Sequence, residues 1–278
     1  MQEARRRVGQ PRDTVRWMGE DAYFTTDDGV FFVPTGFTRG PWDVDACHAG
    51  PPAALLARAS ELHVPDKPLV RLLVELNRPI PMSGFSIDVE TVRPGRTVTA
   101  TRLILHDAER TYAVASGLHL AEEDLGPVPT HRVTTTGPEE AVPGEFPVRE
   151  YHHDEMAFPA SLEVRYDPSF SHGQGGETFM WARSVVPILS GEEPSTFQRV
   201  CPLADSGNGI SWHLPATEML FLNADLVVSV HRQMGGEWVG SHCRSYWEPT
   251  SIGRADAELF DADGPIGRAL QHLILRRS

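Results

Sequence analysis

Gly50-Pro51-Pro52-Ala53-Ala54-Leu55-Leu56-Ala57-Arg58-Ala59 predicts a helix that is small and apolar on nearly every side. Proline costs little in the first turn of a helix, because the amide proton that it lacks has no partner there in any case. A helix without a polar face has to be enclosed by other elements. Strands are predicted directly after it, near 69–78, 85–93, 96–107 and 110–120, and their short connections favour an antiparallel sheet.

The chain repeats itself. Val74-Glu75-Leu76-Asn77-Arg78 falls on Val228-Ser229-Val230-His231-Arg232, a shift of 154 because 232 minus 78 is 154. The apolar alternation then stays in register without a gap for roughly fifty residues, although few residues are identical. The repeat therefore predicts four further strands, near 221–232, 236–247, 252–262 and 265–276.

This duplication indicates two units of about 120 residues each. Pro, Gly and Thr are frequent between them, without the periodicity of a core element, which is typical of a linker. We expect a flexible tail at 1–19, an N-terminal domain at 20–124, a linker at 125–155 and a C-terminal domain at 156–278. Further strands are predicted ahead of each helix, as a hairpin near 22–35 and as strands near 160–166 and 177–186.

The helix of the second unit is predicted to begin at Ser195, because Ser195 and Gln198 have the spacing of a capping box. Pro202 and Gly207 interrupt its later turns, so this helix should kink or open and leave backbone groups free. Freed amides at such a break can bind an oxyanion. A simple loop is the commoner outcome of a helix break.

Composition and charge restrict the partners of the chain. Forty per cent of the 278 residues are apolar and 23 per cent are charged, which is typical of a soluble globular protein, and we expect no membrane span. The net charge of −13 argues against nucleic acid and mildly disfavours polyanionic ligands, because phosphates need clustered Lys and Arg. Three distant cysteines and the lack of an apolar leader favour the cytoplasm.

Several other kinds of site are disfavoured. Cys47 beside His48 suggests a thiol nucleophile, but adjacent side chains rarely meet, and a buried inert cysteine is commoner. His152-His153-Asp154 lacks a second ligand pair at metal spacing, so a solvated segment is favoured. The glycine-rich stretch 172–176 lacks the Lys-Ser or Lys-Thr of a phosphate loop. No Gly-x-Ser-x-Gly elbow is present, which excludes an α/β-hydrolase.

A set of short motifs is characteristic of one family. It comprises Gly40-Pro41-Trp42-Asp43, His48-Ala49-Gly50-Pro51-Pro52-Ala53-Ala54-Leu55-Leu56, Leu162-Glu163-Val164-Arg165, Asn223-Ala224-Asp225-Leu226, His231-Arg232 and Gly267-Arg268-Ala269-Leu270-Gln271. From about residue 20 to its end the chain resembles the acyl-CoA thioesterase II-like family. The resemblance implies an α+β double hotdog, with two antiparallel sheets each wrapped around a long central helix, forming a pseudo-dimer within one chain.

The resemblance also implies a site. Enzymes of the family hydrolyse the thioester of an acyl-CoA with a water that an aspartate, a hydroxyl residue and a glutamine hold, without a covalent nucleophile and without a cofactor or metal. Carried onto this sequence, the aspartate is Asp205 and the glutamine is Gln271. Asn223 stands at the hydroxyl position. Asparagine can hydrogen-bond to water but cannot relay a proton as a hydroxyl does.

The repeat offers a separate test of these three positions. Subtracting 154 from each of them leads to Pro51, Leu69 and Gly117, none of which can replace its counterpart. We therefore expect one site in the pair of units, with its polar groups from the second unit.

Substrate-binding groups are expected at the start of the first helix. The amides of Ala49 and Gly50 can stabilise a developing oxyanion, although a plain helix entry is an equal interpretation of Gly50. His48 is a candidate base, against the commoner role of a capping or packing residue. Arg78 and Arg232 coincide across the repeat, which favours a structural ion pair or carbonyl contact over binding of CoA phosphates.

We expect a cytoplasmic acyl-CoA thioesterase that releases free acid and CoA from a fatty or other acyl-CoA. A non-catalytic hotdog protein that binds acyl groups or small molecules is the first alternative, motivated by Asn223 and the acidic surface. A hotdog dehydratase is the second, disfavoured because we find no Asp and His at its spacing. Assembly into a homo-oligomer is compatible with the sequence.

Overall fold

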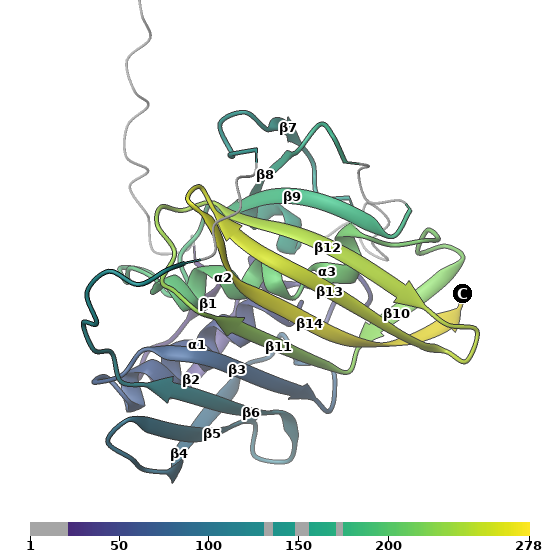
Figure 1. Cartoon of the computed structure of the whole chain (residues 1–278). Helices are drawn as coiled ribbons and strands as arrows, with labels where there is room; N and C mark the ends of the chain where they lie inside the picture. The colour runs from purple at the N-terminus through teal and green to yellow at the C-terminus, as the bar shows by residue number, and fades with distance from the viewer. Residues whose placement is uncertain (1–21, 131–135, 148–155, 171–174) are drawn as a thin grey trace, which may run out of the picture.

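A computed structural model describes residues 22–130, 136–147, 156–170 and 175–278. The predicted tail at 1–19, the motif at 152–154 and most of the stretch at 172–176 lie outside these residues. The described strands form one 14-stranded sheet in the order β1-β2-β4-β5-β6-β3-β11-β14-β13-β12-β9-β8-β7, with β10 beside β14. Figure 1 shows β3 next to β11 in the middle of this sheet.

The first half contains one long helix and the strands predicted around it. Its elements are β1 (Phe24–Thr25), β2 (Phe31–Pro34), η1 (Gly36–Thr38), α1 (Gly50–His63), β3 (Leu69–Leu76), β4 (Phe85–Arg93), β5 (Val98–His106) and β6 (Thr111–Leu120). Ala54, Leu55 and Leu56 of α1 are fully buried, and the helix packs against the strands β3 to β6. Burial on all sides explains why this segment needs no polar face.

The second half repeats the strands but not the helix. Its elements are β7 (Val142–Gly144), η2 (Phe158–Ser161), β8 (Leu162–Tyr166), β9 (Glu177–Ser184), α2 (Thr196–Ala204), α3 (Gly207–Ile210), β10 (Met219–Asn223), β11 (Asp225–Val230), β12 (Val239–Trp247), β13 (Ile252–Asp261) and β14 (Gly264–Arg277). The predicted long second helix is broken into α2 and α3. Pro202 and the glycines after it explain the break.

The shift of 154 residues holds for the strands. It carries β4 onto β12 residue for residue, and the paired residues Val74 and Ala115 onto the paired residues Val228 and Ala269. It fails for the helices, because it carries the first residue of α1 onto the last residue of α2. Pro51 is therefore not the structural counterpart of Asp205, and that part of the repeat argument is wrong. The physical reason is a longer connection between helix and strand in the second half.

The two predicted sheets are joined into one. β3 and β11 pair antiparallel, with Val74 opposite Leu226 and Leu72 opposite Val228. Each of these strands would otherwise present an edge of unpaired backbone groups, which the pairing removes. The predicted strand at 221–232 is divided at Ala224, whose carbonyl accepts the amide of Leu76 across the junction.

The two halves also contact each other through their helices. Ser195 caps α2 by accepting the amide of Gln198 at 3.2 Å, as predicted. The Gln198 side chain does not reach back to the cap, because it donates to Glu61 of α1 at 2.7 Å. Ser195 also donates to Glu61. At the other end of the contact, a Cβ on Gly50 would lie 2.9 Å from the backbone of Pro202, so only glycine permits this approach.

The segment predicted as a linker is partly integrated into the fold. Ala141 and Phe146 are buried, and β7 pairs with β8. Within the described residues, no helix is long and apolar enough to cross a membrane.

Candidate active site

Asp205 is the C-cap of α2, at the break between α2 and α3, so its backbone carbonyl is available for hydrogen bonds from outside the helix. Its carbonyl oxygen accepts Nε2 of Gln271 at 2.6 Å and Nδ2 of Asn223 at 3.3 Å. A Cβ on Gly207 would lie 2.5 Å from Oε1 of Gln271, so this glycine makes room for the amide group. The interruption of the helix therefore brings the three predicted polar residues together.

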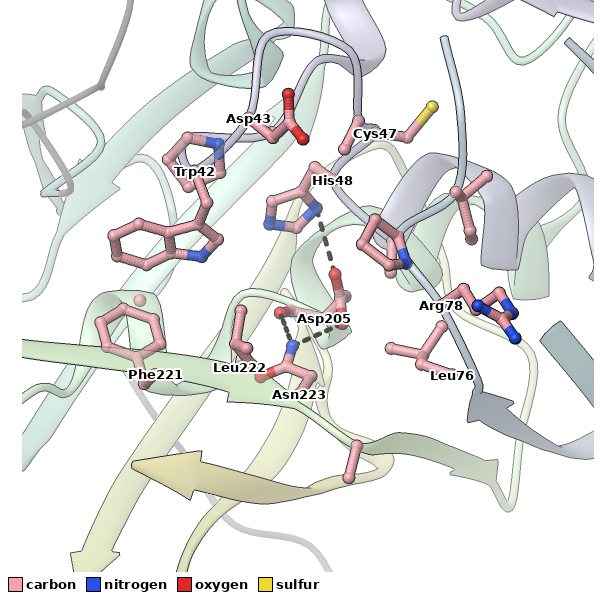
Figure 2. Close-up of a pocket in the computed structure, with 18 of the residues that line it drawn as sticks. Trp42, Asp43, Cys47, His48, Leu76, Arg78, Asp205, Phe221, Leu222 and Asn223 are labelled. Carbon is pink, nitrogen blue, oxygen red and sulfur yellow. Dashed lines mark hydrogen bonds and ion pairs between the residues drawn. The ribbon is translucent and has the colours of Figure 1, made fainter. Parts of the chain in front are cut away.

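The carboxylate of Asp205 is held on both oxygens. Oδ1 accepts Nδ2 of Asn223 at 2.8 Å and Nε2 of Gln271 at 3.1 Å. Oδ2 lies 3.1 Å from Nδ1 of His48, which comes from the first half of the chain. Figure 2 shows His48, Asp205 and Asn223 converging in this way. Residues that are far apart in the sequence thus form one cluster at the contact of the two halves.

Burial changes the ionisation of both acid and base. Burial raises the pKa of Asp205 to about 7, although hydrogen bonds from Asn223, Gln271 and the amides of Gly50 and Ala49 oppose the rise. Burial lowers the pKa of His48 to about 3, so this imidazole is neutral at neutral pH. The carboxyl group, and not the imidazole, changes its charge near pH 7.

Two contacts hold His48 in place. Its ring stacks on Phe158 with 4.0 Å between centroids, and its Nδ1 accepts the amide of Gly50 at 3.2 Å. The single lone pair of Nδ1 is used by this amide, so the 3.1 Å contact places Oδ2 of Asp205 against the edge of a neutral ring. His48 therefore helps to bury the carboxyl group without neutralising it.

A cavity of about 360 Å³ opens beside this cluster. Trp42, Phe146, Phe221 and Asn223 contribute to its wall together with Asp205. The rings of Trp42 and Phe221 meet edge to face, with their centroids 5.0 Å apart. A carboxyl group with a pKa near neutrality therefore faces a mostly aromatic and aliphatic cavity.

The predicted substrate-binding residues occupy two layers. His48 and Ala49 line the cavity, whereas Gly50 is buried against α2. Gln271, which is 1% exposed, lies behind Asp205 and does not line the cavity. The amides of Ala49 and Gly50 act on the Asp205 carboxylate.

Two contributors escape sequence reasoning. Phe146 lines the cavity from the predicted linker, where an isolated aromatic residue among Pro and Gly is the only signal. Asn208 donates its amide to Oε1 of Gln271 at 3.3 Å and so orients the side-chain amide. No motif signals this contact, because it depends on how α3 restarts after the break.

The disfavoured sites gain no support. Burial raises the pKa of the Cys47 thiol to about 12, so it stays protonated, in keeping with an inert cysteine. In the part of the chain that the structure describes, no three His, Cys, Asp or Glu side chains lie close enough to hold a metal ion. The motif at 152–154 is not among those residues.

The two arginines that coincide across the repeat differ in their contacts. Arg232 pairs with Asp261 at 2.5 and 2.6 Å and donates to the carbonyl of Gly264, so the predicted structural ion pair is confirmed for it. Arg78 lines the cavity.

Two family models match most of the chain. The acyl-CoA thioesterase N-terminal domain matches residues 38–121, and the acyl-CoA thioesterase C-terminal domain matches residues 138–275. The chain belongs to the acyl-CoA thioesterase family. No curated protein matches the chain in sequence.

Solved structures of low sequence identity share the fold of this thioesterase-family protein. A hot dog fold protein from Alicyclobacillus acidocaldarius is 16% identical, with a TM-score of 0.71 over 94% of this chain and 99% of its own. The acyl-CoA thioesterase II TesB2 from Mycobacterium marinum is 14% identical, with a TM-score of 0.65 over 93% and 96% of the two chains. The tesB protein of Mycobacterium avium subs paratuberculosis is 13% identical, with a TM-score of 0.65 over 91% and 95%. These likenesses establish a hotdog fold, with a mostly antiparallel sheet and few helices.

Proposed function

We propose that this family member hydrolyses the thioester of an acyl-CoA, with Asp205 as the general base. The observation that supports the proposal best is a buried carboxyl group, with a pKa of about 7, at the wall of an apolar cavity. A base works best when its pKa lies near the operating pH, and a well-placed base typically contributes about 10²–10⁴-fold. The family and its acyl-CoA substrates support the choice of reaction.

In the proposed reaction, water binds in the cavity against Asp205 and Asn223 and attacks the carbonyl carbon of the thioester. Ionised Asp205 takes one proton from this water as the new C–O bond forms. The tetrahedral intermediate then collapses with cleavage of the C–S bond, and Asp205 returns the proton to the leaving sulfur. The products are a carboxylic acid and free CoA, and no covalent enzyme intermediate is formed.

The remaining groups have supporting roles in this proposal. Asn223 orients the water through its amide, in place of the hydroxyl group that the family pattern has. Gln271 acts as a positioning residue, because its amide bonds to Asp205 and to the amide of Asn208. The start of α1, with Ala49 and Gly50, provides a positive dipole for charge that develops at the carboxylate or the thioester oxygen.

We further propose a double hotdog organisation of this protein in the cytoplasm. In this interpretation residues 20–124 and 156–278 are two hotdog units, connected by 125–155, and a single site serves the pair. Its support is the strand register that the two halves share and the site between them.

A non-catalytic acyl-binding protein is the second candidate, because Asn223 stands at the hydroxyl position of the family. It predicts saturable binding of a non-hydrolysable acyl-CoA analogue without turnover. Calorimetry with such an analogue, beside a thiol-release assay, distinguishes binding from catalysis.

Thiol release from a panel of short to long acyl-CoA substrates tests the proposal. We expect Asp205→Asn to lower kcat by about 10²–10⁴-fold, because the amide cannot accept the proton. Asp66→Asn is the matched control, since Asp66 lies on the surface away from the cavity. Absence of CoA release by the wild-type protein, or full activity of Asp205→Asn, would contradict the proposed function.

A further inference from the structure

Arg78 follows β3 and Arg232 follows the equivalent strand β11, but the contacts of the two guanidinium groups differ. In the second half, Arg232 is neutralised by Asp261, which accepts two hydrogen bonds from its guanidinium. Asp261 is 1% exposed, so the carboxylate of this ion pair is buried, while Arg232 is partly buried. The shift of 154 residues carries Arg78 and Asp107 onto this pair.

In the first half the corresponding pair is not formed. Asp107 accepts the hydroxyl of Tyr112 and the amides of Glu109 and Arg110, the two amides at 2.8 Å each. The counterpart of Tyr112 in the second half is Ile266, which has no hydroxyl to offer. In the first half the equivalent carboxylate is thus bonded to a tyrosine and two amides, and among the described residues it makes no ion pair with Arg78.

Arg78 is an exposed residue at the wall of the cavity. Within the described chain, its guanidinium makes no hydrogen bond or ion pair to another residue, and no other Lys or Arg lines the cavity. The other charged groups of the wall are Asp43, an exposed residue, and Asp205, while His48 is neutral. An unpaired cation is thus retained at the cavity of a protein whose net charge is −13.

The position of Arg78 gives the cavity two ends. Figure 2 shows Trp42 and Phe221 on one side of Asp205, and Arg78 and Leu76 on the other. An apolar chain fits against the two aromatic rings, whereas an oxyanion fits against the guanidinium, which binds phosphate or carboxylate in a planar fork. A thioester between the two ends would lie next to Asp205.

We propose that Arg78 binds an oxyanion of the substrate and thereby sets the direction in which the substrate lies. The inference rests on the proposed function for the identity of the substrate. The oxyanion has two chemical sources, the phosphates of the CoA moiety or a carboxylate on the acyl group. If Arg78 binds the phosphates, the acyl chain occupies the end lined by Trp42 and Phe221. If Arg78 binds an acyl carboxylate, the acyl chain lies at the Arg78 end and the pantetheine arm lies against Trp42 and Phe221.

Calorimetric binding of thioether analogues tests this role without any need for turnover. We compare S-hexyl-CoA, S-hexyl-pantetheine and S-(carboxypentyl)-pantetheine on the wild-type protein, Arg78→Gln, Arg78→Lys and Arg71→Gln. Arg71 lies on β3 as an exposed residue that does not line the cavity, so its variant is the matched control. We expect Arg78→Gln to weaken the binding of S-hexyl-CoA or of S-(carboxypentyl)-pantetheine about tenfold or more. The loss of affinity should be smaller in Arg78→Lys and absent in Arg71→Gln.

The pattern of losses identifies the source of the oxyanion. A loss in Arg78→Gln for S-hexyl-CoA but not for S-hexyl-pantetheine assigns the phosphates. A loss for S-(carboxypentyl)-pantetheine alone assigns an acyl carboxylate. Equal affinities of wild type and Arg78→Gln in all arms overturn the proposal, as does an equal loss for S-hexyl-pantetheine, which would mean that Arg78 only shapes the cavity. Binding without thiol release would refute the proposed function and leave the role of Arg78 intact.

Tyr112→Phe gives a second test that leaves the cavity residues unchanged. Removal of the hydroxyl frees Asp107 to attract Arg78, as Asp261 attracts Arg232. We expect a severalfold loss of affinity for the same anionic analogue that Arg78→Gln weakens. The double variant Tyr112→Phe/Arg78→Gln should show no further loss, and an additive loss would contradict the inference.

Discussion

The same location in the two halves of the chain holds different polar groups. In the first half, Ser60 of α1 is hydrogen-bonded to Thr101 and His119 of the facing strands, at 2.8 Å each, and all three side chains are fully buried. They fill the space in front of Gly117, where a Cβ would lie 2.4 Å from Oγ1 of Thr101. In the second half, the position equivalent to Gly117 is Gln271, whose amide reaches Asp205.

The second half has apolar residues where the first has this hydrogen-bonded cluster. Ala255 and Leu273 stand at the positions equivalent to Thr101 and His119. The small side chain of Ala255 leaves room for a long one from the next strand, and Gln271 occupies it. The same location is therefore a closed core in the first half and a support for the Asp205 carboxylate in the second half. The difference lies in which of two neighbouring strands provides the polar side chain, Thr101 in the first half and Gln271 in the second.

The largest expected effect concerns pH, because only the second half contains a titrating carboxylate at the cavity. Asp205 must lose its proton to act as a base, and its pKa is about 7. We therefore expect kcat/KM to fall about tenfold per pH unit below 7, hence about a hundredfold at pH 5. Thiol-release rates in a series of buffers measure this. A rate that stays level between pH 5 and 8 would contradict Asp205 as the base.

Ser60→Ala tests the first half as a purely structural region. The variant leaves His119 and Thr101 without their shared partner in a fully buried place. We expect the free energy of unfolding to fall by about 1–3 kcal/mol, with activity per folded molecule unchanged. Urea unfolding followed by circular dichroism measures the stability. A large loss of kcat in folded Ser60→Ala would show that the first half contributes to catalysis.

Gln271→Leu sharpens the difference between positioning and chemistry. The leucine removes hydrogen bonds that lower the pKa of Asp205 and hold its backbone carbonyl. We expect a loss of about tenfold in kcat/KM, together with an upward shift of the pH profile. A lower rate with an unshifted profile would indicate a role that does not pass through Asp205. Gly117→Ala is the matched change in the first half, and it should lower stability without shifting the profile.

Asn223→Thr restores the hydroxyl group of the family pattern. Because asparagine already donates to Asp205 at 2.8 Å, the gain in orienting water is offset by the loss of that bond. We expect a change in kcat of less than about tenfold in either direction, the smallest effect of the series. Asn223→Ala should be more damaging, and equal rates for all three residues would argue against a role of this position in the reaction.

Much of the fold follows from the local sequence. The apolar stretch from Gly50 predicts α1, and period-two alternation predicts β4 to β6 and β12 to β14 with their common shift. The helix shift fails because a break at Pro202 and a longer connection change the position of α2 without disturbing the strands. Strand register depends on an alternation that insertions in a loop do not alter.

Asp205, Asn223 and Gln271 were also predicted from the sequence, through motifs and a family resemblance. Their convergence was not readable from spacing, because it depends on the backbone of Asp205 being freed at the break. The same holds for His48, whose distance to Asp205 results from the packing of α1 on α2.

Hydrophobic periodicity and helix-breaking residues thus determined which elements form and in which order, since these are properties of a few consecutive residues. The tertiary structure decided which polar groups meet. The joining of β3 to β11, the pKa of Asp205 and the presence of Arg78 at the cavity all result from long-range contacts and burial. Desolvation depends on every neighbour that packs around a group, and those neighbours come from distant parts of the chain.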